Sequence, residues 1–180
     1  MQSESKFLVI AYPGLEKSDL KKIQNHRELF DKESHAMVPP HFTFVFPVSN
    51  MEASEFANEV KKQIADISSI RFVIRCAAVN RDVVNDCYHT FLIPDKGYSK
   101  MVKLHDRLYS DKLKAHLRLD IDFIPHITIG TAADASSCKK MADDWNEKDI
   151  EIRGILKFAD IVQHAAGKVI TLERIKLRKN

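Results

Sequence analysis

A four-residue pattern occurs twice in this 180-residue chain and limits how the chain can fold. The copies read HFTF at residues 41–44 and HITI at residues 126–129, and each follows a proline, Pro40 or Pro125. Successive side chains of a β-strand point to opposite faces, so a strand through either copy would separate His and Thr from the apolar residues. Two such strands would supply two imidazoles and two hydroxyls that can converge on one anionic group.

The segments before and after the first copy have clear local signals. A buried strand is expected over residues 7–12, because the run FLVIAY is apolar and ends at a Pro-Gly turn. A helix is expected from Ser18, where apolar residues recur at near-helical spacing, until the prolines before the motif stop it. The motif strand over 41–48 is followed by a predicted helix over 51–67 and a predicted strand over 70–79.

The second half of the chain repeats this order. Its predicted elements are a strand over 88–93, a helix over 98–109, the motif strand over 124–130, a helix over 135–146 and paired strands over 150–162 and 168–177. We therefore expect one α+β domain over residues 1–180, built as a duplicated fold of two lobes related by an approximate two-fold axis. The halves span about 1–80 and 87–180, and residues 80–86 form the crossover between them.

Composition agrees with an ordinary globular domain. The chain is 44% hydrophobic and 29% charged, and its net charge of +3 is compatible with an anionic substrate without requiring a nucleic-acid partner. Its longest apolar segments have the length of strands, far short of the roughly 18 residues of a membrane span. The start of the sequence lacks a basic segment before a long apolar run, so no secretory signal is expected.

The cysteines favour a reducing compartment. Cys76, Cys87 and Cys138 are an odd number without a CxxC pair, which argues against a disulfide scaffold or a zinc ribbon. We expect a cytoplasmic protein without a membrane partner or an obligate protein partner.

The doubled motif has the groups that phosphoester cleavage needs. Histidine titrates nearest neutral pH, so His41 and His126 could act as base and acid, one on the attacking oxygen and one on the leaving oxygen. The hydroxyls of Thr43 and Thr128 could donate to the non-bridging phosphate oxygens, where negative charge must be held. This scheme requires no metal or other cofactor.

Two competing chemistries fit the sequence less well. Zinc ligands usually come at tight spacings with Cys or a carboxylate joining, and neither motif has such a neighbour, so no metal is predicted. The chain also lacks a GxxxxGK[ST] phosphate loop, which excludes a nucleoside-triphosphate site of that kind.

The two motifs resemble those of the 2H phosphoesterases, a family that includes 2′,3′-cyclic nucleotide phosphodiesterases and 2′-5′ RNA ligase-like proteins. The resemblance covers nearly the whole chain, because the order of strands and helices around both motifs also fits. It implies two antiparallel-sheet lobes with helices outside and a central cleft, with His41, Thr43, His126 and Thr128 at the floor of the cleft. It also implies metal-independent chemistry on a 2′,3′-cyclic phosphate or a related phosphodiester.

Further residues could line such a site. Tyr12 ends the first strand of the first half, while Tyr88 and His89 lie on the first strand of the second half. Aromatic side chains there could stack on a base.

The favoured hypothesis is a metal-independent phosphodiesterase that opens 2′,3′-cyclic phosphates on nucleotides or RNA ends. The alternatives are nuclease-like or ligase-like activity on linear 2′-5′ or 3′-5′ oligonucleotides, and a module that binds nucleotides or RNA ends without turnover.

Overall fold

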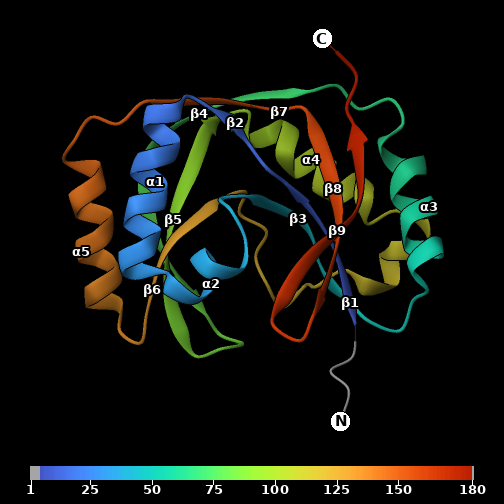
Figure 1. Ribbon diagram of the computed structural model, residues 1–180, viewed down its shortest axis with the longest axis horizontal. Coiled ribbons are helices and arrows are strands. Elements are labelled where there is room, and N and C mark those ends of the chain that lie inside the picture. Colours follow the sequence, from blue (N-terminus) through green and yellow to red (C-terminus); the bar gives the residue numbers. More distant parts are fainter. Residues whose placement is uncertain (1–4, 180) are drawn as a thin grey trace.

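The computed structural model describes residues 5–179 and contains two antiparallel sheets (Figure 1). The four-stranded sheet has the order β3-β1-β8-β9, with β1 (Lys6–Ala11), β3 (Phe42–Val48), β8 (Phe158–Ala165) and β9 (Lys168–Lys176). The five-stranded sheet has the order β2-β7-β4-β5-β6, with β2 (Gly14–Leu15), β4 (Ile70–Asp82), β5 (Cys87–Lys96), β6 (Ile127–Ala132) and β7 (Ile152–Leu156). The expected α+β fold with two antiparallel sheets is confirmed.

Helices flank both sheets. They are α1 (Lys17–Phe30), α2 (Lys32–Met37), α3 (Ala53–Ile64), α4 (Tyr98–Leu108), α5 (Ala135–Asn146) and the 3-10 helix η1 (Asp111–His116). α1 and α5 lie beside the five-stranded sheet, whereas α3 lies at the opposite end of the molecule beside the four-stranded sheet (Figure 1). The motif strands β3 and β6 each form one edge of a sheet.

Each sheet takes strands from both halves of the sequence. β4 of the first half joins β5, β6 and β7 of the second half, while β8 and β9 of the second half join β1 and β3 of the first half. The first helix of each half is exchanged in the same way, because α1 contacts β6 and α4 contacts β3. The two repeats are therefore interlocked by their pairing.

Three predicted segments differ from the observed ones. The strand expected over 150–162 is divided at Lys157, because Leu156 pairs with Ile70 in the five-stranded sheet and Phe158 pairs with Lys176 in the four-stranded sheet. The expected crossover over 80–86 is a hairpin turn between the paired strands β4 and β5. The helix expected up to the prolines is divided into α1 and α2 at the buried Asp31.

One hydrophobic core joins the two sheets. Phe42 of β3 meets Phe72 of β4 with ring centroids 5.1 Å apart, and both side chains belong to the same buried cluster. Burial of such side chains contributes about 1.5–3 kcal/mol each, so the core fixes how the sheets pack.

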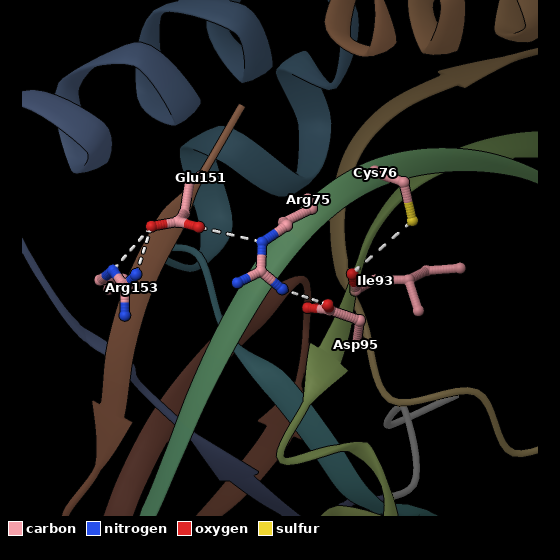
Figure 2. Close-up of polar contacts among 6 residues, drawn as sticks. All are labelled: Arg75, Cys76, Ile93, Asp95, Glu151 and Arg153. Atoms are coloured by element: carbon pink, nitrogen blue, oxygen red, sulfur yellow. Dashed lines mark hydrogen bonds and ion pairs between the residues drawn. The ribbon is translucent and has the colours of Figure 1, made fainter. Parts of the chain in front are cut away.

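Exposed charged side chains link strands of the five-stranded sheet. Arg75 of β4 contacts Asp95 of β5 and, at 3.0 Å through Nε, Glu151 just before β7, and Glu151 also contacts Arg153 (Figure 2). Exposed ion pairs contribute about 0–1 kcal/mol each, so the strand register depends mainly on the buried face. Within the described part of the chain, no helix has the length and hydropathy to cross a bilayer.

Candidate active site

Both motifs lie at the start of an edge strand, and the histidine comes immediately before it. Phe42, Phe44, Ile127 and Ile129 are buried, as the alternation of a strand requires. The histidines and threonines of both motifs are only partly buried, on the opposite face. The predicted separation of the two faces is therefore observed in both copies.

The two motif strands share an irregularity at the same position. In β3, Thr43 pairs with Ile10, and the register then shifts so that Val45 pairs with Val9. In β6, Thr128 pairs with Phe91, and the register shifts in the same way directly after this threonine. A bulge bends its strand and changes the aim of nearby side chains, so both repeats present His and Thr on a similarly distorted backbone.

The two imidazoles are held in the same orientation. Nδ1 of His41 lies 2.9 Å from the carbonyl oxygen of Pro39, and Nδ1 of His126 contacts the carbonyl oxygen of Ile124. Because a carbonyl oxygen can only accept, Nδ1 carries the proton and donates it in both rings. Nε2 of each ring is then the atom left for a ligand or a proton.

Each motif imidazole contacts an aromatic ring. The Tyr12 ring meets His41 edge-on at a centroid distance of 6.4 Å. The Phe91 ring stacks on His126 at a centroid distance of 3.5 Å, and His89 stacks on Phe91 at 5.7 Å. Tyr12 directly follows β1, the strand paired with β3, and Phe91 lies on β5, the strand paired with β6.

The pKa values of the two motif histidines are lowered in the same direction. The pKa of His126 is lowered to about 4, mainly by burial; the Ile124 carbonyl opposes this effect, and positive charge on His41 or His89 would act in the same direction as burial. The pKa of His41 is also lowered, first by burial and then by the Arg27 guanidinium. Both imidazoles are therefore neutral in the free protein at pH 7.

The threonine hydroxyls are available for a ligand. Neither Thr43 nor Thr128 makes a side-chain hydrogen bond within residues 5–179, and both side chains are partly exposed. Each threonine follows the histidine of its motif by two residues, so each hydroxyl lies on the same strand face as that imidazole.

The predicted lining residues fall on different faces. Tyr12 contacts His41, and His89 reaches His126 through Phe91. Tyr88 has the same strand face as Thr90, whose hydroxyl donates to the Cys138 carbonyl of α5. Tyr88 therefore faces the helix layer, on the side opposite to His89.

The sequence did not reveal a charged pair beside Tyr12. Asp160 of β8 is fully buried and accepts a 2.7 Å hydrogen bond from Nε of Arg174 on β9, while its other oxygen has no partner within the described residues. The Arg174 guanidinium lies 5.8 Å from the centre of the Tyr12 ring and 5.4 Å from that of Phe158. Burial and the nearby Asp160 raise the pKa of the Tyr12 hydroxyl. In the sequence, the only sign of this buried charge is that Asp160 interrupts the apolar run ADIV, residues 159–162.

A groove of about 500 Å³ lies elsewhere, between α1 and the segment from α5 to β7. His26, Trp145 and Ile150 line it, and none of the predicted site residues does.

A duplicated α+β fold with a His-x-Thr motif at the edge strand of each sheet is the architecture of a 2H phosphoesterase. The profile of the 2′-5′ RNA ligase superfamily matches residues 13–168. The chain belongs to this family, which supports a phosphodiesterase or RNA-end processing role.

Solved structures agree with this fold. Escherichia coli LigT complexed with 3′-AMP is 16% identical and has a TM-score of 0.55, with 99% of this chain and 100% of that chain covered. Kluyveromyces marxianus Usb1 with uridine monophosphate is 12% identical and has a TM-score of 0.53, with 94% of this chain and 98% of that chain covered. A search of curated protein sequences gives no significant match.

Proposed function

We propose that this protein is a metal-independent phosphodiesterase that hydrolyses 2′,3′-cyclic phosphates of nucleotides or RNA ends. The observation that carries the proposal is the matched pair of imidazoles, His41 and His126: each places Nδ1 against a carbonyl oxygen, and neither Nε2 has a hydrogen-bond partner among the described residues. Nucleotides are bound by the similar proteins LigT and Usb1, which adds support for a nucleotide ligand.

In the proposed reaction, Nε2 of one neutral histidine takes a proton from water as the oxygen attacks phosphorus. The other histidine, protonated when the phosphate anion is bound, donates a proton to the departing 2′ or 3′ oxygen. An anion next to an imidazole favours the imidazolium, which offsets the effect of burial on the pKa. Thr43 and Thr128 donate to the non-bridging oxygens, where they hold the added charge.

The test is turnover of a 2′,3′-cyclic mononucleotide with EDTA present. His41→Ala and His126→Ala should each lower kcat by about 100-fold or more, because each removes an acid or base from the same step. The double variant should be little worse than either single variant, since the two groups act together. His116→Ala, in η1, is the matched control and should keep the wild-type rate.

Wild-type rates in both motif variants would reject the assignment. Tight nucleotide binding without product would instead identify a module that binds RNA ends.

Turnover of linear 2′-5′ or 3′-5′ oligonucleotides is a second candidate function. It is favoured by Arg174, because the guanidinium edge that does not contact Asp160 could hold a neighbouring phosphate. A cytoplasmic location is part of the proposal and is supported by three free thiols, Cys76, Cys87 and Cys138.

A further inference from the structure

We propose that Asp82, Cys87 and His89 form a zinc-binding site at the hairpin between β4 and β5. Asp82 ends β4 and pairs directly with Cys87 at the start of β5, while His89 is two residues further on the same strand face. One ligand atom from each residue lies within 4.8 Å of the other two, and all three side chains are partly buried. The hairpin therefore brings a carboxylate, a thiol and an imidazole to one point.

The spacing of these atoms fits a tetrahedral ion. Cys87 Sγ lies 3.8 Å, and Asp82 Oδ2 lies 3.2 Å, from the same atom, Nε2 of His89. Ligand atoms bound to zinc at their usual lengths and tetrahedral angles are about 3.3–3.6 Å apart. In a catalytic relay the thiol and the carboxylate would contact opposite nitrogens of the ring, so the convergence on one nitrogen favours a shared ion.

Hydrogen bonds around the site orient its ligands. His89 Nδ1 lies 2.9 Å from Thr131 Oγ1, and the Thr131 hydroxyl donates to Asp31 Oδ1 at 3.4 Å. Because that hydroxyl proton points to Asp31, Thr131 accepts from His89 Nδ1–H. Nε2 then directs its lone pair at the Asp82 carboxylate, which is unfavourable unless a cation or a second proton lies between them.

The Asp82 carboxylate is also fixed. Its Oδ1 accepts hydrogen bonds from the backbone N–H groups of Val84 at 2.8 Å and Asn85 at 3.1 Å. Metal ligands held by such outer hydrogen bonds need little reorganisation on binding. A mixed sulfur, nitrogen and oxygen set favours Zn²⁺ over Mg²⁺ or Ca²⁺, and three protein ligands leave a fourth position open. The alternative occupant is a proton, which would make a simple His89–Asp82 ion pair.

The test is a titration of the EDTA-treated, dialysed protein with Zn²⁺ against a chromophoric chelator. We expect one Zn²⁺ per chain. Cys87→Ser and His89→Gln should weaken binding by more than about 100-fold, and Thr131→Val, which removes an orienting group, by about tenfold. Cys76→Ser is the matched control, because Cys76 is exposed and its Sγ lies 4.0 Å from the Ile93 carbonyl oxygen (Figure 2).

Co²⁺ gives an independent reading of the thiolate ligand. A thiolate-to-cobalt charge-transfer band should appear in the wild type and in Cys76→Ser, and should be missing in Cys87→Ser. Thermal unfolding in EDTA checks that the variants are folded. A wild-type protein without stoichiometric Zn²⁺, or equal affinity in Cys87→Ser and Cys76→Ser, would overturn the site in favour of the ion pair. This outcome is independent of the proposed reaction, which is assayed with EDTA present.

Discussion

His41 and His126 carry the proton on the same ring atom for the same reason. Each Nδ1 donates to the carbonyl oxygen two residues before it, so the local backbone sets the tautomer in both copies. Their lowered pKa values have a consequence for the pH dependence of the proposed reaction.

We expect kcat/KM for a 2′,3′-cyclic mononucleotide to be highest below pH 6.5. The pH dependence of kcat/KM reflects the pKa values of the free enzyme, and the reaction needs one imidazole protonated and the other neutral. The pKa of His126 is about 4 and that of His41 is also below the ordinary value, so both rings are neutral above pH 6.5. The rate should then fall by up to about tenfold for each pH unit. A pH–rate profile that stayed level from pH 6.5 to 8.5 would contradict the two-histidine assignment.

Arg174 should affect long substrates more than short ones. Asp160 occupies its Nε, which leaves the outer edge of the guanidinium for a phosphate beside the reacting one. Arg174→Gln is expected to raise KM about tenfold for an RNA fragment with a cyclic phosphate end. The kcat should be nearly unchanged, because the lost contact binds the substrate and the transition state equally. The mononucleotide should show no change.

Lys168→Gln is the control for Arg174, because it removes an exposed cation at the other end of β9. Equal effects of Arg174→Gln on the mononucleotide and on the RNA fragment would show that the arginine does not read a second phosphate.

At the scale of the elements, local periodicity predicted most strands and helices. The helix over 135–146 has the bounds of α5, and the helix over 98–109 ends one residue beyond α4. The bulge after each motif threonine was not predictable, because it depends on the pairing of β3 with β1 and of β6 with β5. Those partners come from distant parts of the chain.

Gly97 at the N-terminus of α4 is an element-scale requirement. Its φ is +87°, and a Cβ there would lie 2.6 Å from the Arg71 carbonyl oxygen. Gly167, in the turn between β8 and β9, has a φ of +70° but nothing within 4 Å of such a Cβ. Gly167→Ala should therefore cost only the left-handed backbone penalty of about 1 kcal/mol. Gly97→Ala should lower the free energy of unfolding by at least about 1 kcal/mol more, as measured with urea.

Equal losses in the two glycine variants would mean that the Arg71 carbonyl moves away at no cost. The prediction concerns the junction of α4 with β4, so it does not depend on the chemistry of the site.

At the scale of the whole molecule, the exchange of strands makes the two halves interdependent. Neither sheet can form from residues 1–80 or from residues 87–180 alone as it is observed. One buried cluster also spans both sheets. The chain should therefore unfold as one cooperative unit.

This cooperativity can be measured with probes on the two sheets. Trp145 of α5 reports the side of the five-stranded sheet, and amide hydrogen exchange in β1 and β8 reports the four-stranded sheet. The free energies of unfolding from fluorescence and from the slowest amides should agree. Two separate transitions would show that the sheets unfold independently.

The sequence by itself determined the two strand faces, the placement of His41 and His126 on equivalent strands and the family to which the chain belongs. These depend on alternation along a strand and on repetition, which are local properties of the chain. Only the tertiary structure decided which strands pair, and so placed Arg174 beside Tyr12 and joined Asp82, Cys87 and His89 to Thr131. The reason is that strand pairing and burial depend on contacts between segments far apart in the sequence, and a local sequence pattern does not contain these contacts.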